Sequence, residues 1–222
     1  MGADFVAVSG IAKSSSAGHP YAVANELLCG MLGRGIGLPI PPGFIIEDGG
    51  TPWHVSLNFN LAGQQLPPAD CAALVQAQPF LAAGIIVFDA WIVNADRHPG
   101  NLAFDQSTGR VNVFDHSHAF YPSTIGRQHL INHEKDALVA RNALTSHIKD
   151  LASVSSWLDR ISQVPHFWIE DAVRGAVGVG LPAADTQFCI DYLENRRTSL
   201  RSLLLAQQNA FTGVVPALWA QF

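Results

Sequence analysis

The chain has 222 residues, of which 48% are hydrophobic, and carries a formal net charge of −5. This length is enough to bury a sizeable core and too short for several large domains. The thirteen lysine and arginine residues are scattered along the sequence, and a chain without a basic stripe lacks the electrostatic footprint of nucleic-acid-binding proteins. We therefore expect one compact unit, with no nucleic-acid partner.

Targeting, membrane and disulfide signals are not evident in the sequence. Residues 1–6 lack the basic and apolar regions of a signal peptide, and the most apolar stretch, Phe80 to Val93, is too short to span a bilayer. Cys29, Cys71 and Cys189 are far apart and form no C-x-x-C pair, so neither a disulfide framework nor a zinc cluster is indicated. A cytoplasmic protein without a membrane partner is expected.

The first part of the chain predicts strands and one helix. Phe5 to Val8 is a short β-prone run, and apolar residues at helical spacing predict a helix over residues 21–35. The residues at 44–46 and 53–59 favour strands, and the Asp-Gly-Gly turn at 48–50 between them predicts a hairpin.

The rest of the chain is predicted to be mainly helical. Residues 63–70 form a connector, residues 80–93 a buried core helix, and residues 185–207 a final amphipathic helix. Apolar residues between Leu144 and Ile161 also recur at helical spacing. A short strand pair near residues 100–120 interrupts the helices.

A polar loop between the core helix and this strand pair carries the most informative side chains. Phosphoryl transfer needs a carboxylate to orient the acceptor hydroxyl, together with oxygen ligands that hold Mg²⁺ against the phosphate. Asp96 and Asn101 lie five residues apart in one loop, and Asp115 follows on the far strand of the hairpin that turns at residues 107–110. These three side chains can converge on one site.

The pattern D-R-H-x-x-N, followed by a strand ending in D-x-x-x-A-F, resembles the catalytic and metal-binding loops of HipA-like protein kinases and of phosphatidylinositol 3/4-kinases. Residues 24–26, with the helix that leads to the turn at 38–42, are similar to the small-lobe helix of HipA-like kinases. The resemblance covers residues 20–120. It implies an α+β, two-lobed protein-kinase-like fold, with a reduced small lobe at residues 1–60, a helical large lobe at residues 61–222 and the nucleotide between them.

The resemblance also implies roles for single residues. Asp96 would be the catalytic carboxylate, and Asn101 and Asp115 would bind Mg²⁺. Glu26 would pair with a lysine that holds the phosphates of ATP, although a solvated helix position is an alternative. His98 is a second candidate proton carrier, because lipid kinases with this loop place a histidine there.

Two parts of the nucleotide site depart from the family pattern. Almost nothing precedes Phe5, so the glycine-rich loop that covers the phosphates is expected to be absent. The strand expected to carry the lysine holds Ala7 and Val8 instead. Lys13, placed in the following loop, is then the lysine left to pair with Glu26, and a surface position is its alternative.

Three functions follow from these residues. The leading prediction is an ATP- and Mg²⁺-dependent phosphotransferase acting on a hydroxyl, preferably on Ser or Thr of a protein, since no basic membrane-facing cluster is evident. Asn58 and Asn60 lie where a kinase hinge contacts adenine, although polar residues are common at strand ends. The second is a degenerate kinase fold that binds a nucleotide or a protein partner without turnover, because the loop and the lysine are missing.

The third prediction is a histidine-ligated metal protein. On a strand, His116 and His118 would point to one face, a spacing that suits Zn²⁺ or Fe²⁺. His98, His129 and His133 could complete such a site. The H-x-H pair equally suits a loop that packs around a Mg²⁺ ligand.

Overall fold

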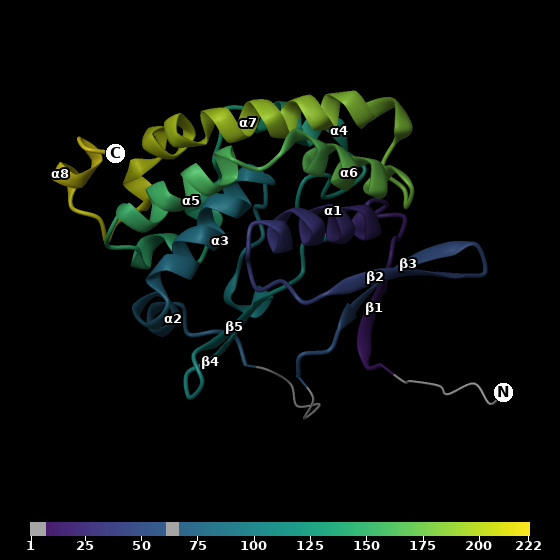
Figure 1. Cartoon of the computed structure of the whole chain (residues 1–222), viewed down its shortest axis with the longest axis horizontal. Coiled ribbons are helices and arrows are strands. Elements are labelled where there is room, and N and C mark those ends of the chain that lie inside the picture. Colours follow the sequence, from purple (N-terminus) through teal and green to yellow (C-terminus); the bar gives the residue numbers. More distant parts are fainter. Residues whose placement is uncertain (1–7, 61–66) are drawn as a thin grey trace.

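The computed structural model describes residues 8–60 and 67–222. Its first part is a three-stranded antiparallel sheet in the order β1-β3-β2, with one helix against it (Figure 1). The elements of this part are β1 (Gly10–Ser14), α1 (Ala22–Gly35), β2 (Gly43–Asp48) and β3 (Thr51–Leu57). Strands β2 and β3 form a hairpin, and β1 pairs with the free side of β3.

The second part is mainly helical and contains one small antiparallel strand pair. Its strands are β4 (Leu102–Asp105) and β5 (Arg110–Val113). Its α-helices are α2 (Cys71–Ala77), α3 (Pro79–Trp91), α4 (Arg127–Asn132), α5 (Ala152–Ser162), α6 (His166–Val177), α7 (Thr186–Ala206) and α8 (Pro216–Trp219). Short 3₁₀ turns lie at Pro99–Asn101, Val139–Arg141, Thr145–His147, Ala183–Asp185 and Gln208–Ala210.

Helix α3 is the centre of the core. It is buried from Ala82 to Trp91, as its almost continuous apolar sequence requires, because a helix that is apolar all round needs neighbours on every side. It packs against α5 and α7, and the indole nitrogen of Trp91 donates to the carbonyl oxygen of Leu193 on α7 at 2.9 Å. This core supports the loop that follows α3.

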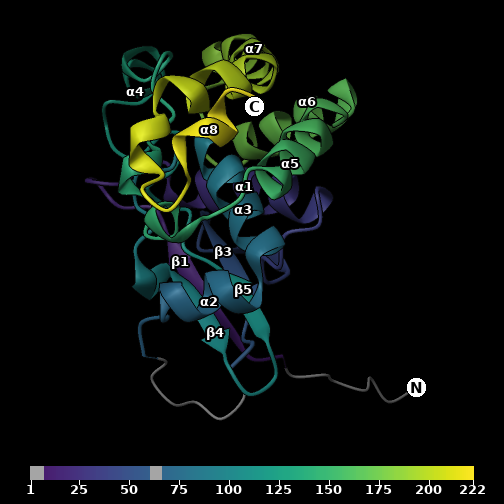
Figure 2. The same cartoon turned by 90° about the vertical axis from the view of Figure 1, so that its left-hand side faces the viewer.

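Helix α1 joins the two parts of the molecule. It contacts all three strands of the first sheet and lies along α6, where Gly175 leaves room for Leu27 and Met31. Figure 2 shows the helices stacked over the small sheets, with α1 and α3 close to the centre. Side chains on α1 can therefore face both the sheet and the loops of the helical part.

Most of the predicted elements are confirmed. Helices are found at residues 22–35 and 79–91, and the hairpin at residues 43–57 is present. In the part of the chain that the structure describes, no single helix is long and apolar enough to cross a bilayer, although α2 and α3, bent by 117° at their junction, reach that length and composition together.

Three details of the described elements differ from the predictions. The first described strand begins at Gly10, and Val8 lies outside it, while residues 5–7 of the predicted strand fall outside the described chain. The apolar spacing that starts at Leu144 predicts a helix that begins too early, because α5 begins only at Ala152. The predicted helix at residues 185–207 is confirmed as α7, but it is not the last helix, because the short helix α8 follows it.

Candidate active site

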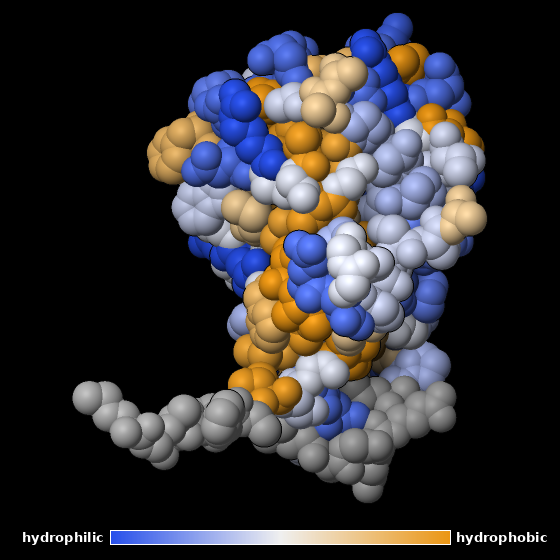
Figure 3. Space-filling view, turned by 90° about the vertical axis from the view of Figure 1, so that its right-hand side faces the viewer, coloured by the Kyte–Doolittle hydropathy of each residue, from blue (hydrophilic) through white to orange (hydrophobic). Residues whose placement is uncertain are grey.

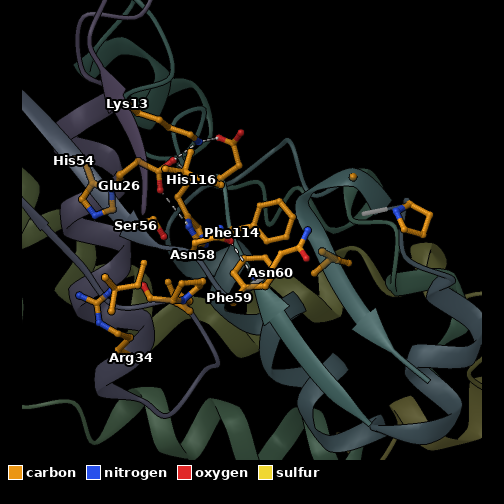
Figure 4. Close-up of a pocket in the computed structure, with 18 residues that line it drawn as sticks. Lys13, Glu26, Arg34, His54, Ser56, Asn58, Phe59, Asn60, Phe114 and His116 are labelled. Atoms are coloured by element: carbon orange, nitrogen blue, oxygen red, sulfur yellow. Dashed lines mark hydrogen bonds and ion pairs between the residues drawn. The ribbon is translucent and has the colours of Figure 1, made fainter. Parts of the chain in front are cut away.

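Lys13 lies on a strand, not in the loop expected from the sequence. It belongs to β1 and stands opposite His54 of β3, so both side chains are on the sheet face toward α1. Its Nζ is 2.7 Å from Oε1 of Glu26 on α1 and 2.8 Å from Oδ1 of Asp115 (Figure 4). The lysine that the sequence placed wrongly is therefore paired with the predicted glutamate.

Lys13 stabilises the charges of the two carboxylates, and both carboxylates stabilise the charge of Lys13. Burial opposes ionisation of Glu26, but a hydrogen bond from His116 and the charge of Lys13 outweigh it and hold the pKa of Glu26 well below its usual range. Burial likewise opposes the charge on Asp115, and the bond from Lys13 lowers the pKa of that carboxyl. Burial acts to lower the pKa of Lys13, yet the two carboxylates raise it above its ordinary value. All three groups are charged at neutral pH.

This shift predicts how stability depends on pH. An unfolded Glu26 takes up a proton near its ordinary pKa of 4.5, whereas the folded form resists protonation to much lower pH. The free energy of unfolding therefore falls as the pH drops below 4.5. In Glu26→Gln that decline should be shallower by about 1.4 kcal/mol per pH unit, the value for one proton. Chemical denaturation at several pH values measures this slope.

The matched control for this prediction is Glu134→Gln, the same change at an exposed position. It should leave the acid slope as it is in the unchanged protein. Equal slopes in Glu26→Gln and the unchanged protein would show that Glu26 does not hold its charge through its two partners.

The turn after β5 is held to α1 by Asn25. The side-chain nitrogen of Asn25 donates to the carbonyl oxygens of Ser117 at 2.8 Å and Tyr121 at 2.9 Å, and its oxygen accepts from Tyr121 N at 3.2 Å. Asp115 lies two residues beyond β5, not on the strand as predicted, and has a left-handed φ of +58°. This conformation, uncommon outside glycine, asparagine and aspartate, directs its carboxylate toward Lys13.

Asp96 and Asn101 are neighbours in the loop after α3. The side-chain nitrogen of Asn101 donates to the backbone oxygen of Asp96 at 2.8 Å and lies 3.5 Å from its carboxylate. The amide oxygen of Asn101 is thus left to accept or to bind a metal ion. The backbone N–H of Phe114 donates to Asn101 O at 3.2 Å, so the residue before Asp115 is fastened to Asn101.

His98 is exposed and has a local bond. Its Nδ1 accepts from the backbone N–H of Gly100 at 3.0 Å, and so it caps the 3₁₀ turn that begins at Pro99. His98 therefore supports the loop as well as offering a titratable group.

A buried ion pair beneath this loop was not anticipated. Arg97, 0% exposed, meets Asp89 of α3 through two hydrogen bonds of 2.9 and 3.1 Å. Its remaining nitrogen donates to the carbonyl oxygens of Asn101 at 3.0 Å and Phe114 at 2.8 Å. One guanidinium therefore fixes both the loop of Asp96 and the loop of Asp115. The available signal was an aspartate in an otherwise apolar helix, since a buried charge requires a partner.

A cavity of about 420 Å³ lies between the first sheet, α1 and the β4–β5 pair (Figure 4). Among its lining residues are Lys13, Glu26, Asp115, Asn58 and Asn60, so five of the eight predicted site residues face one space. The side chains of Asp96, His98 and Asn101 do not line it, although their loop contributes Gly100 and leads directly into Leu102.

The histidines do not converge on a metal site. His116 is buried against Glu26 and lines the cavity, whereas His118 contacts His19 edge to face, with ring centres 4.7 Å apart. His129 and His133 contact each other elsewhere. Within residues 8–60 and 67–222, no group of three or more His, Cys, Asp or Glu side chains is arranged to hold a metal. The H-x-H prediction is wrong because both histidines lie in a turn and not on a strand.

Comparisons with known proteins support the same fold. A family model described as HipA-like kinase matches residues 60–189, which is more than half of the chain. Among solved structures, the Helicobacter pylori proinflammatory kinase CtkA is similar with a TM-score of 0.53 and 14% identity, over 90% of this chain and 89% of that chain. The predicted two-lobed kinase-like fold is thereby confirmed. No curated protein matches the chain.

Proposed function

Because the chain belongs to the HipA-like kinase family, we propose that it is an ATP- and Mg²⁺-dependent phosphotransferase that acts on a hydroxyl group, with Ser or Thr of a protein as the acceptor. The observation that carries this proposal is the convergence of Lys13, Glu26 and Asp115 at one cavity. A lysine held by a helix glutamate, beside a metal-binding aspartate, is the arrangement that positions ATP in protein kinases.

The cavity suits a nucleotide whose base lies toward the segment after β3. Ile11 of β1 and Leu102 of β4 line it from the two parts of the molecule, and Phe59 lies against Phe114 with ring centres 5.4 Å apart. The side chain of Asn58 already bonds Ser9 Oγ and the N–H of Asn60. Apolar contact and backbone groups, more than the Asn58 amide, would therefore recognise the base.

The groups for phosphate chemistry lie at the Lys13 end of the cavity and in the adjoining loop that contributes Gly100 to it. Lys13 would neutralise phosphate charge, and Asn101 and Asp115 would hold Mg²⁺ through the amide oxygen and the carboxylate. Magnesium in such sites takes few protein ligands and completes its shell with phosphate and water oxygens, so one asparagine and one aspartate are a fitting set. The bound metal supplies charge stabilisation for the transferred phosphoryl group.

Asp96 would act on the acceptor. Its carboxylate lies 3.5 Å from the Asn101 amide, and its backbone N–H is fixed by Asn94 Oδ1 at 3.0 Å. A carboxylate held in this way can orient a hydroxyl and accept its proton as the phosphoryl group is transferred. A protein hydroxyl is preferred over a lipid headgroup because the net charge of −5 gives the chain little attraction to anionic lipids.

A degenerate kinase fold that binds a nucleotide or a protein partner without turnover is the second candidate. The observation in its favour is that, among the described residues, no strand pairs with the outer side of β1, where a phosphate-covering loop would lie. The lysine that the sequence predicts to be missing is supplied by Lys13, which pairs with Glu26, and this pairing weakens the case for a protein without turnover. Transfer of phosphate that depends on Asp96 would rule this candidate out.

Thermal unfolding with and without ATP and Mg²⁺ tests the nucleotide site. Ligand at about 100 times its dissociation constant adds about 2.7 kcal/mol of stability, and each kcal/mol raises Tm by roughly 2–4 °C for a chain of this size. The shift should require Mg²⁺ and disappear in Asp115→Asn, because asparagine tolerates the left-handed conformation but lacks the charge.

The matched control is Asp171→Asn, the same substitution at an exposed position of α6. This variant should keep the full Mg²⁺-dependent shift. A shift that is equal in Asp115→Asn and Asp171→Asn would place the nucleotide elsewhere and contradict the proposed site.

A further inference from the structure

Three residues of β2 turn their backbone N–H and C=O groups away from the sheet. Leu57 N donates to Pro42 O at 2.8 Å, and bonding groups alternate between the two sides of an antiparallel strand. Phe44 and Ile46 therefore face β3, whereas Gly43, Ile45 and Glu47 present their groups on the opposite edge. No described residue bonds to them there.

The same strand exposes apolar side chains. Phe44 is 45% exposed and Ile46 is 43% exposed. They stand opposite Val55 and Trp53 on β3, so the four side chains share one face of the sheet, away from α1. Apolar surface gathers on the side of the molecule from which the β2–β3 hairpin projects, orange in Figure 3. An open edge with apolar side chains is a ready site for another strand.

We propose that this edge pairs with the same edge of a second copy of the chain, so that two three-stranded sheets form one antiparallel six-stranded sheet. A two-fold axis at Ile45 aligns the two copies of β2. Ile45 then faces Ile45 of the second copy, and Gly43 faces Glu47 of the second copy. These are the residues whose backbone groups point outward, so each pair exchanges two hydrogen bonds.

The side chains and charges of β2 favour this partner. In the same register Phe44 lies opposite Ile46 of the second copy, which pairs an aromatic with a β-branched residue on the exposed face. Glu47 meets a glycine, and Asp48 lies beyond the paired centre, so no carboxylate faces a carboxylate. The sequence of β2 is therefore compatible with an antiparallel copy of itself in this register.

The dimer would leave the candidate active site open. In the sheet order β1-β3-β2, Lys13 lies on β1, at the edge opposite the proposed contact. The strand pair is smaller than the interfaces of permanent dimers, so the association should depend on protein concentration.

Sedimentation velocity over a range of concentrations tests the proposal. The unchanged chain should sediment as a mixture of monomer and dimer. The double variant Phe44→Lys, Ile46→Lys places lysines opposite one another across the axis and should raise the dissociation constant by at least about tenfold. The matched control is Phe167→Lys, which replaces an apolar side chain of α6 that is 61% exposed. This control variant should dimerise as the unchanged chain does.

A mixing experiment tests the register. Phe44→Glu and Ile46→Lys, each weakened alone, should associate with each other because the register brings residue 44 of one copy to residue 46 of the other. Circular dichroism verifies that each variant is folded. A chain that stays monomeric at every concentration, whether the edge remains in water or serves another protein, overturns the proposal. So does a dimer that resists the double lysine variant as well as Phe167→Lys does.

Discussion

Asp96→Asn is expected to lower the rate of phosphate transfer by a factor of about 10²–10⁴, the usual contribution of a positioned general base. Asparagine has nearly the same shape as aspartate and keeps an oxygen near Asn101, so the loop should remain folded. It cannot accept the proton of the acceptor hydroxyl. Affinity for ATP and Mg²⁺ should change much less, because the side chain of Asp96 does not line the cavity.

The measurement is transfer from γ-labelled ATP to a mixture of dephosphorylated proteins and to water, with ATP affinity followed separately. His98→Gln is the companion variant, because His98 is the other candidate proton carrier and its bond to Gly100 N can be kept in part by an amide. A modest loss is expected there. If His98→Gln abolished transfer while Asp96→Asn preserved it, the roles of the two residues would be exchanged.

The site residues differed in how well the sequence could place them. Asp96 and Asn101 are five residues apart, so a single loop brings them together whatever the rest of the chain does. Lys13 and Glu26 meet only after β1 has paired with β3. The segment from Gly10 to Ser14 contains residues that are poor strand formers, and the pairing with β3 overrides that local preference.

The secondary structure shows the same contrast between elements set by local sequence patterns and segments set by tertiary contacts. Helices α1 and α3 were predictable because their apolar residues have strong local patterns. The region from Leu144 to Leu151 carries the same apolar spacing but forms only a short 3₁₀ turn. There Asn142 bonds Asp89, and Ala143 N bonds Arg97 O at 2.9 Å, so the segment is held to the loop of Asp96 by tertiary contacts that no local pattern shows.

Asp89→Asn is expected to lower the free energy of unfolding more than any other single substitution proposed for this protein. Asp89 accepts two hydrogen bonds from Arg97 and one each from Asn94 and Asn142. Removing the charge leaves the guanidinium of Arg97 without compensation at a fully buried position. Breaking a buried ion pair in this way typically costs about 3–5 kcal/mol, and each kcal/mol lowers Tm by roughly 2–4 °C.

The effect of leaving Arg97 unpaired can be separated from the general effect of losing a carboxylate. Asp159→Asn removes one partner of an exposed pair with Arg201 that is 3.9 Å apart, and such pairs contribute about 0–1 kcal/mol. The double variant Asp89→Leu, Arg97→Met removes both buried charges and should recover part of the loss in unfolding free energy, because apolar residues can replace a buried pair. The recovery is incomplete because the side-chain amides of Asn94 and Asn142 lose their acceptor. It should still impair phosphate transfer, since the Arg97 side chain donates to the backbone oxygens of both Asn101 and Phe114. Equal denaturation midpoints for Asp89→Asn and Asp159→Asn would contradict this account, whereas a stable but inactive double variant would identify the pair as the group that positions the two loops.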